Sequence, residues 1–225
     1  MSKTVVISGA SQGIGFALAQ KMLAEGYSVI GSSRSGKIEG IDNPNFHSIA
    51  LDLTEESSIQ KAKEVIFRLC TNNIDMLINN AGIGPDLNSS APERATFDKT
   101  FAVNVTGTVF FTEAILPKIK KNGKIINVSS KMGAMAVCST ADSAAYRMSK
   151  SALNMYTKIL SNRLQGRINV AIMHPGWVKT NISPGSKLHA PLTPKQSAEN
   201  MYRFFSQDFE TGTYWDSATD SQLPW

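Results

Sequence analysis

The chain has 225 residues, of which 42% are hydrophobic and 18% are charged, and its formal net charge at pH 7 is +5. This length suits one α/β domain with a substantial core. No apolar run approaches the ~18 residues of a membrane-spanning helix, and the basic charge forms neither a stripe nor a nucleic-acid-reading motif. A transmembrane helix is therefore excluded, and nucleic-acid binding is not expected.

Short apolar strands alternate with amphipathic helices along the chain. The first strand runs into a glycine-rich turn, after which Ile14, Leu18 and Met22 recur at helical spacing. The segments predicted to be strands are residues 4–8, 27–33, 46–52, 74–80, 123–130, 167–175 and 213–215. Most are apolar throughout, as expected of a parallel sheet that helices cover on both faces. We therefore predict one α/β domain over residues 1–225, with a doubly wound, mostly parallel sheet of about seven strands.

Three segments between these elements are rich in Gly, Pro or Ser and lack any regular period. They are residues 83–93, 131–144 and 181–194, and each follows the carboxyl end of a predicted strand. Because open α/β sheets bind their ligands at this edge, we expect these segments to form the substrate loops.

The turn after the first strand reads SGASQGIG, which places Gly9, Gly13 and Gly15 at a strand-to-helix junction. Glycine lets the backbone turn tightly and approach a pyrophosphate, and the helix N-terminus offers free N–H groups to the phosphates. Tight turns also use glycine for purely steric reasons. Here the strand before and the helix after supply the context that a dinucleotide site requires, so we predict a bound dinucleotide.

The end of the second strand indicates which dinucleotide is preferred. An Asp or Glu at this point binds the ribose hydroxyls of NAD, whereas this chain reads GSSRS, with Ser33 followed by Arg34. Without the acid a 2′-phosphate is not repelled, and Arg can bind it with a forked pair of donors. The alternative is a solvated loop arginine. We predict NADP(H) as the preferred cofactor, with NAD(H) possible.

Tyr146 and Lys150 lie four residues apart in AAYRMSKSALNM, so a helix places them on one face. The ammonium group is expected to lower the pKa of the phenol from its ordinary value near ~10, which makes a proton donor usable near neutral pH. Hydride transfer to a carbonyl needs such a donor. Taken singly, a core tyrosine, a surface lysine and a strand-end serine are plausible readings of Tyr146, Lys150 and Ser130.

The chain resembles a short-chain dehydrogenase/reductase over nearly its whole length, because the family's motifs all occur in the family's order. They are the glycine turn, the NNAG segment at 79–82, Asn104 in FAVNVTGTVF, NVSS ending at Ser130, the pair Tyr146 and Lys150, and PGWVKT starting at Pro175. Within the family, YRMSKSALNM, HPGWVKT and LPW are similar to the small carbonyl reductases related to C-factor and sniffer. The resemblance implies a single-domain Rossmann fold and an NADPH-dependent carbonyl reductase or alcohol dehydrogenase.

The resemblance also implies a role for each matching residue. Tyr146 would act as general acid or base, Ser130 would hold the carbonyl oxygen, and Lys150 would bind the nicotinamide ribose. Asn104 would anchor a water that links Lys150 to solvent. The expected cofactor-binding residues are Gly9, Ser11, Gln12, Gly13, Ile14, Gly15, Ser33, Arg34, Asp52, Leu53, Asn80, Ala81, Gly82, Tyr146, Lys150, Pro175, Gly176, Val178 and Thr180.

Two departures from the family pattern matter. Ser130 lies sixteen residues before Tyr146, farther than in much of the family, and Ser129 is a minor alternative for its role. Gln12 occupies a position in the glycine turn where many NADP-preferring relatives carry a basic residue. This leaves Arg34 largely alone in selecting NADP(H).

The substrate is expected to contact Ser130 and an apolar wall that includes Met132, Cys138 and Trp177, although core packing explains each wall residue equally well. A small to medium ketone, aldehyde or quinone would suit such a wall. The alternatives are a reductase with a dedicated substrate, such as a pterin or a 3-oxoacyl thioester, and a nucleotide-sensing signalling protein on the same fold. The sequence does not separate the substrates, because specificity lies in the irregular loops.

Partners and compartment follow from the remaining signals. The resemblance implies a homodimer or homotetramer that packs the helix carrying Tyr146, whose further apolar residues are Met148, Ala152, Met155, Tyr156 and Ile159. His47, His174 and His189 lack metal-ligand spacing, so no metal is expected. The early first strand leaves no room for a signal peptide, and Cys70 and Cys138 are typical of free thiols. We expect a cytoplasmic protein.

Overall fold

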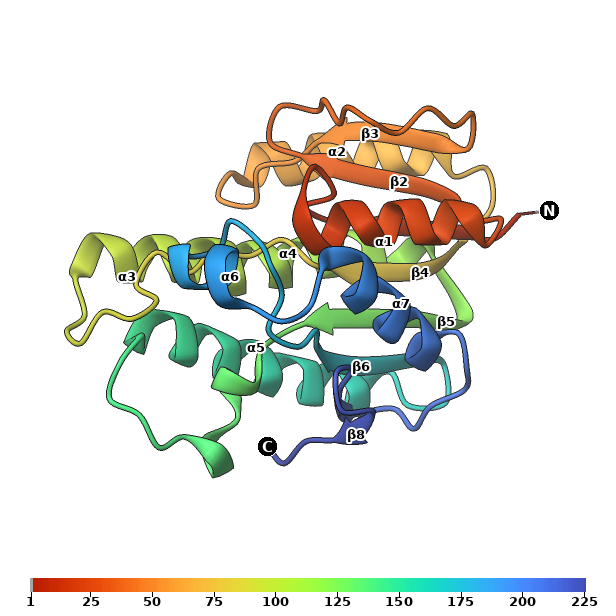
Figure 1. The fold of residues 1–225 in the computed structure, drawn as a ribbon. Helices are drawn as coiled ribbons and strands as arrows, with labels where there is room; N and C mark the ends of the chain where they lie inside the picture. Colours follow the sequence, from red (N-terminus) through yellow and green to blue (C-terminus); the bar gives the residue numbers. More distant parts are fainter. Residues whose placement is uncertain (1) are drawn as a thin grey trace.

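The computed structural model describes residues 2–225 and joins eight strands in one sheet. The strands are β1 (Thr4–Ile7), β2 (Ser28–Ser33), β3 (Phe46–Ala50), β4 (Ile74–Asn79), β5 (Ile119–Val128), β6 (Ile168–His174), β7 (Thr213–Asp216) and β8 (Ser221–Gln222). Their order is β3-β2-β1-β4-β5-β6-β7-β8, and only the β7–β8 pair is antiparallel (Figure 1). The first six positions follow the strand order of the Rossmann fold. The predicted doubly wound, mostly parallel sheet is confirmed, and the short β8 adds an eighth strand.

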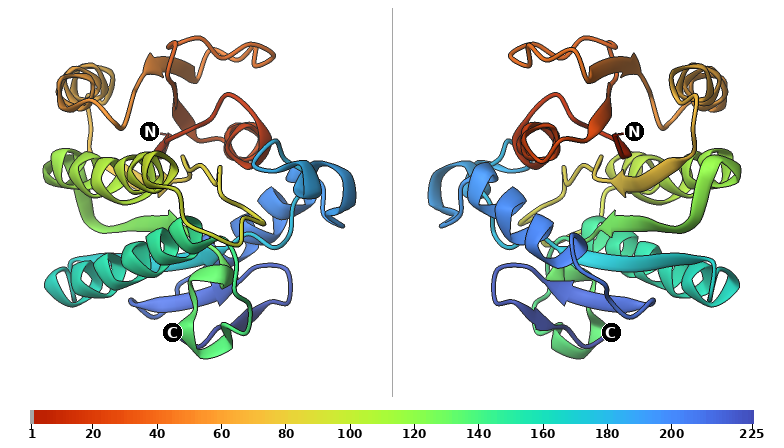
Figure 2. Two further views of the ribbon diagram at one scale, coloured as in Figure 1. Left: turned by 90° about the vertical axis from the view of Figure 1, so that its left-hand side faces the viewer. Right: turned by 90° about the vertical axis from the view of Figure 1, so that its right-hand side faces the viewer.

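Helices cover both faces of this sheet (Figure 2). The α-helices are α1 (Gly13–Ala24), α2 (Glu56–Leu69), α3 (Arg94–Phe101), α4 (Thr108–Ile115), α5 (Ala144–Arg163), α6 (Pro184–His189) and α7 (Pro194–Phe205). A π-helix, η1 (Ala102–Gly107), joins α3 to α4, and the 3-10 helices are η2 (Leu116–Lys118), η3 (Lys131–Gly133) and η4 (Met135–Val137). Within residues 2–225, none of these helices combines the length and apolarity that a membrane crossing requires.

Two apolar cores lie on opposite faces of the sheet, because successive strand residues point to opposite sides. On β1, Val5 and Ile7 belong to the core that α1 and α7 cover, whereas Val6 belongs to the core under α2, α4 and α5. All three side chains are fully buried. Covering both faces removes the need for polar residues along the central strands, which explains their continuous apolar runs.

The strand order reverses beside β1, which positions the ligand site. β2 and β3 extend the sheet to one side of β1, and the chain then returns so that β4 pairs on the other side. Open α/β sheets bind ligands at the carboxyl ends of the strands at such a switch point. The segments 83–93, 131–144 and 181–194 follow β4, β5 and β6, so they leave the sheet at this same edge.

One strand begins earlier than its apolar run predicts. β5 starts at Ile119 rather than at residue 123, because Ile119 is buried and pairs with Ile74 of β4. Lys120 lies in the strand and forms an ion pair with Asp75, whose other carboxylate oxygen accepts from the N–H of Thr4. Long-range pairing therefore extends the strand through a basic segment that lacks apolar periodicity.

Candidate active site

A cavity of about 520 Å³ opens at the carboxyl ends of β4, β5 and β6. Its lining comes from the first turn of α1, from the loops after the three strands and from α5. The predicted site residues that line it are Ile14, Asn80, Gly82, Ser130, Met132, Tyr146, Lys150, Pro175, Gly176, Trp177, Val178 and Thr180. The fold thus brings together residues predicted to bind cofactor and substrate, which are spread over most of the chain.

Tyr146 and Lys150 lie on consecutive turns of α5, and both side chains are buried. The Nζ atom of Lys150 lies 5.7 Å from the centroid of the Tyr146 ring, and it donates a 3.0 Å hydrogen bond to the carbonyl oxygen of Val128. The last residue of β5 therefore holds the ammonium group beside the phenol. This arrangement follows from the i, i+4 spacing and from the packing of α5 against the sheet.

The pKa values of this pair differ from the sequence-based expectation. Burial raises the pKa of Tyr146 to about 12, although a hydrogen bond with Ser130 acts in the lowering direction. Burial also lowers the pKa of Lys150 to about 8. The expected lowering of the phenol pKa by Lys150 is therefore wrong for this arrangement, because removing both groups from water outweighs their proximity.

The adjacent serines after β5 face different partners. The Oγ atom of Ser129 donates to Oδ1 of Asn154 on α5 at 2.6 Å, whereas Oγ of Ser130 accepts from the N–H of Met132 at 3.2 Å. Ser130 is also the serine whose hydroxyl acts on the phenol of Tyr146. Of the two serines, this geometry favours Ser130 as the partner of Tyr146.

Asn104 lies in the π-helix η1, where the wider turn brings its side chain against the segment after β4. Its Oδ1 accepts from the N–H of Ile83 at 2.8 Å, and its Nδ2 donates to the Ile83 carbonyl and to Oγ of Ser149. A Cβ atom built on Gly82 would lie 3.4 Å from both Oδ1 of Asn104 and Nζ of Lys150. Asn104 and Lys150 therefore approach the same point of the backbone.

The glycine turn packs closely against the segment that follows β4. A Cβ atom on Gly15 would stand 2.2 Å from the carbonyl oxygen of Gly9, so only glycine fits there. Nδ2 of Asn80 donates to that same carbonyl at 3.0 Å, while Oγ of Ser8 accepts from the N–H groups of Asn80 and Ala81. Ser8 was not predicted, because a small polar residue at a strand end has no distinctive pattern.

The residues predicted to bind the adenosine half lie outside the cavity, at the ends of β2 and β3. Arg34 is exposed, and Oγ of Ser33 donates to the carbonyl of Lys37. The hydroxyl and N–H of Thr54 both donate to Asp52 and lower the pKa of its carboxyl, to which Arg34 adds a smaller effect of the same sign. The members of the predicted cofactor set outside the cavity lining are Gly9, Ser11, Gln12, Gly13, Gly15, Ser33, Arg34, Asp52, Leu53 and Ala81.

Gln12 faces the start of the segment 181–194. Its Oε1 accepts from Nδ2 of Asn181 at 3.2 Å. A Cβ atom on Gly13 would stand 3.3 Å from Cγ2 of Thr180, so the glycine turn and the segment after β6 are in close contact. The glycine turn and the start of the segment 181–194 therefore lie against each other.

The structure brings two of the three residues of the predicted substrate wall to the cavity. Met132 and Trp177 line the cavity, and Nε1 of Trp177 donates to Oγ of Ser186, which fixes the indole although it is 52% exposed. Cys138 does not line the cavity, because its loop turns it toward solvent. Lining residues that sequence reasoning missed are Leu87, Asn88, Val128, Lys131, Val137, Arg147, His174, Ile182, Ser183, Gly185 and Ser186. Most lie in the segments 83–93, 131–144 and 181–194, whose sequences have no periodicity that would indicate which side chains face the cavity.

Known proteins resemble this chain in sequence and in fold. Residues 3–189 match the family model described as short chain dehydrogenase. The C-signal protein of Myxococcus xanthus is 33% identical over 165 residues, which cover 70% of this chain and 96% of that protein. The carbonyl reductase Sniffer of D. melanogaster superposes with a TM-score of 0.89 at 25% identity, covering both chains fully. An NADPH-bound carbonyl reductase from chicken fatty liver gives 0.85 at 26% identity, covering 100% and 99%.

Proposed function

Because the chain belongs to the short-chain dehydrogenase family of oxidoreductases, we propose that it is an NADPH-dependent carbonyl reductase, or alcohol dehydrogenase in reverse. The observation that carries the proposal is that Ser130, Tyr146 and Lys150 all line one cavity, which lies beside a glycine turn. A proton donor, a second hydroxyl and a buried ammonium are the groups that carbonyl reduction needs.

The glycine turn fits a dinucleotide. The close approach of Gly15 to Gly9 leaves no side chain between the turn and the N-terminus of α1, whose free N–H groups suit a pyrophosphate. Asn80 and Gly82 would bound the middle of the dinucleotide, while Lys150 and Thr180 would lie at its nicotinamide end. The bound cofactor would supply a hydride to the carbonyl carbon.

NADP(H) is the cofactor that this site suits best. Residues 31–35 at the end of β2 carry no carboxylate that would repel a 2′-phosphate, and exposed Arg34 is free to bind one with two N–H groups. The similar carbonyl reductase from chicken fatty liver is NADPH-bound. NAD(H) is the alternative cofactor, and a comparison of the Kd values for NADPH and NADH distinguishes the two.

Tyr146 would exchange the proton with the carbonyl oxygen. Its pKa of about 12 keeps the phenol protonated at neutral pH, as reduction requires. The hydroxyl of Ser130 would donate to the same oxygen as negative charge develops there. Lys150, held by the Val128 carbonyl, would bind the ribose hydroxyls, and Asn104 would anchor a water that connects Lys150 with solvent.

The substrate would be a small to medium carbonyl compound with an apolar body. The cavity volume of about 520 Å³ is in the range of small-molecule sites. Met132 and Trp177 are joined in the lining by Leu87, Val137 and Ile182, so apolar side chains come from all three substrate loops. An aliphatic or aromatic ketone, aldehyde or quinone would match such a wall.

The proposal also includes a homo-oligomer. On α5 the side chains of Met148, Met155 and Ile159 are 53%, 59% and 56% exposed, and their spacing places them along one side of the helix. Phe110 on the neighbouring α4 is 61% exposed. Glu113 of α4 binds Tyr156 of α5, so the two helices lie side by side. Large exposed apolar side chains on adjacent helices suit contact with a second copy.

The test is NADPH oxidation with a panel of ketones, aldehydes and quinones, for wild type and Tyr146→Phe. We expect turnover by wild type that falls by a factor of about 10²–10⁴ in the variant, because the proton donor is removed. NADPH binding, followed by fluorescence, should be retained. NADPH binding without turnover of any carbonyl, unchanged by the substitution, would favour the nucleotide-sensing alternative.

A further inference from the structure

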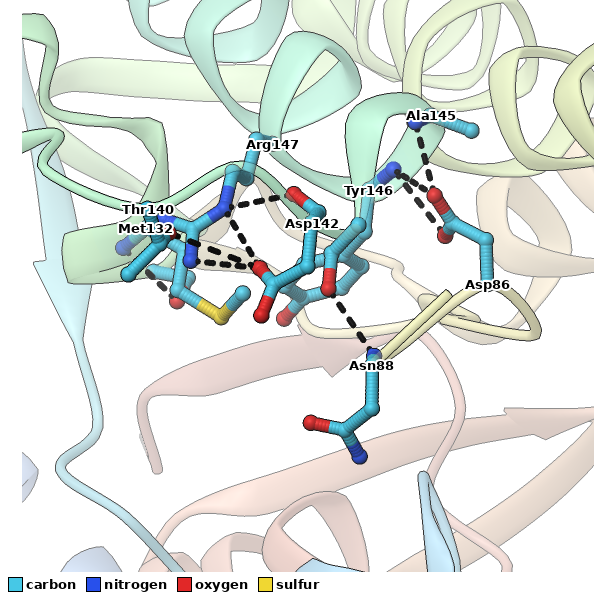
Figure 3. A network of polar contacts seen from close by, with 10 residues as sticks. Asp86, Asn88, Met132, Thr140, Asp142, Ala145, Tyr146 and Arg147 are labelled. Carbon is cyan, nitrogen blue, oxygen red and sulfur yellow. Dashed lines mark hydrogen bonds and ion pairs between the residues drawn. The ribbon is translucent and has the colours of Figure 1, made fainter. Parts of the chain in front are cut away.

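A buried carboxylate holds the first turn of the helix that carries Tyr146. Asp86, in the loop after β4, is only 4% exposed. Its Oδ2 accepts from the N–H of Ala145 at 2.7 Å, and both carboxylate oxygens accept from the N–H of Tyr146, at 3.1 and 3.2 Å (Figure 3). The first N–H groups of a helix have no partner within the helix, so Asp86 supplies the acceptors that this turn lacks.

The carboxylate is held by these N–H groups rather than by a cation. Among the salt bridges of residues 2–225, none includes Asp86, and the nearby Arg147 pairs with Asp142 instead. A buried charge is costly unless hydrogen bonds and favourable dipoles compensate it. The N-terminus of the 20-residue α5 offers both. The buried charge of Asp86 is therefore compensated only when the first turn of α5, which includes Tyr146, lies against the carboxylate.

Two further hydrogen bonds join the same loop to the start of α5. The N–H of Asn88 donates to Oγ of Ser143 at 3.0 Å, and the N–H of Ser143 donates to the carbonyl of Ser89 at 2.8 Å. Ser143 has a φ of 57°, in the left-handed region that few non-glycine residues adopt. These contacts fix the backbone on both sides of the residue at which the helix begins.

We propose that Asp86 is a positioning residue for Tyr146, whose phenol it sets in the cavity by holding the first turn of α5 against the loop after β4. The inference rests on the proposed function, in which Tyr146 exchanges a proton with the substrate. Leu87 and Asn88, the next two residues of the loop, line the same cavity. Asp86 would therefore position these two lining residues relative to the phenol of Tyr146.

The charge of Asp86 gives this role an electrostatic consequence. After burial, which is the dominant effect, the negative charge of Asp86 also raises the pKa of Tyr146. Other titratable groups near the phenol are Lys150 on α5 and Tyr214 on β7, and Arg147 and His174 line the same cavity. The Ser130 hydroxyl acts on the phenol pKa in the opposite direction. Asp86 therefore favours the protonated phenol, the form that reduction requires.

The experiment compares Asp86→Asn, Asp86→Ala and the control Asp98→Asn, an exposed carboxylate that pairs with Arg94 on α3. Asparagine keeps one acceptor oxygen and removes the charge, whereas alanine removes every acceptor. We expect Asp86→Ala to lower kcat by a factor of about 10–10² while the Kd for NADPH changes little, since a small displacement of a catalytic group is enough for such a loss. Asp86→Asn should lower kcat less and shift the alkaline limb of its pH profile to lower pH.

Titration of tyrosinate absorbance supplies a readout that does not depend on turnover. Subtracting the Tyr146→Phe curve from the wild-type curve isolates Tyr146, and the same subtraction in the Asp86→Asn background should give a lower midpoint. The control Asp98→Asn should leave kcat, the pH profile and this midpoint unchanged.

The outcomes separate the inference from the proposed function. If Tyr146→Phe abolishes turnover while Asp86→Asn leaves the pH profile and the titration midpoint unmoved, Asp86 is merely structural and the inference is overturned. If Tyr146→Phe keeps full turnover, the proposed function itself fails. Where Asp86→Ala does not fold, Asp86→Asn alone decides between the two.

Discussion

The hydroxyl of Tyr214 donates a 2.5 Å hydrogen bond to the carbonyl oxygen of Ser130. Tyr214 lies on β7 and is fully buried, and β6 separates its strand from β5, after which Ser130 follows. Ala134 and Leu223 pack in the same small apolar cluster as Tyr214. The backbone of Ser130, the proposed carbonyl-binding residue, is therefore held by a buried side chain of β7, which lies two strands away from β5 in the sheet.

Replacing Tyr214 by Phe should lower both stability and turnover. The variant leaves the buried carbonyl of Ser130 without this donor, so we expect the free energy of unfolding to fall by about 1–3 kcal/mol. Turnover should fall as well, because Ser130 loses its support. Urea unfolding and kcat measure the two effects. Tyr202→Phe is the control, since it removes an exposed hydrogen bond to Glu25 and should cost less than about 1 kcal/mol. Equal losses in both variants would contradict the role of Tyr214.

The two adjacent serines should give opposite results on substitution. Ser130→Ala should lower kcat by a factor of about 10²–10³, as expected when a donor to a developing oxyanion is removed. Ser129→Ala should mainly reduce thermal stability, because Oδ1 of Asn154 loses its buried donor. Steady-state kinetics and thermal unfolding on both variants provide the test. The reverse ranking of kcat would make Ser129 the carbonyl-binding residue.

Arg34→Ala should weaken NADPH binding and leave NADH binding unchanged. A charge-assisted hydrogen bond contributes about 1.5–3 kcal/mol, so the Kd for NADPH should rise by a factor of about 10–10². Fluorescence titration of both cofactors measures the change, with exposed Lys37→Ala as the control for loss of one nearby positive charge. Wild-type protein that binds both cofactors equally would exclude a phosphate contact by Arg34.

Local patterns predicted the features that are local in origin. The glycine turn, the alternation of apolar strands with helices and the Tyr146–Lys150 pair all depend on short spacings, and the structure places each of them as the spacing implies. The strand order does not follow from any local pattern, because a doubly wound sheet can take more than one order, and the Rossmann fold was implied by the family resemblance.

The residues that sequence reasoning missed act over long separations. Asp86 binds the N–H of Tyr146 across 60 residues, and Tyr214 binds Ser130 across 84, so no periodicity connects either pair. The pKa of Tyr146 was predicted in the wrong direction for a related reason. An i, i+4 spacing reports that Lys150 is near, but only the packed fold shows that burial of the phenol dominates.

Substituting the exposed face of α5 should dissociate the proposed oligomer. Met155→Lys combined with Ile159→Lys places two charges on the apolar face, which a subunit interface would not tolerate. Sedimentation velocity should show a dimer or tetramer for wild type and a monomer for the double variant. Met135→Lys, at a 73% exposed side chain in η4 rather than on α5, is the control and should not change the assembly. A monomeric wild type would refute the interface.

His174 should make stability sensitive to acid. It is the last residue of β6, and within residues 2–225 its Nδ1 is buried without a hydrogen-bond partner. Burial lowers the pKa of its imidazole to about 4, an effect that the negative charge of Asp216 partly opposes and Lys131 reinforces. The neutral ring is therefore the form that the fold accepts.

The sign of the effect follows from proton binding. Between the ordinary pKa of about 6.5 and the folded value of about 4, the unfolded chain binds a proton that the folded protein does not. Stability is therefore lost as pH falls through this window, by at most about 3 kcal/mol from this group. In His174→Gln the free energy of unfolding, measured in urea from pH 7 to pH 4, should fall less steeply than in wild type. Exposed His189→Gln should keep the wild-type slope, and equal slopes in all three proteins would show that His174 does not control acid stability.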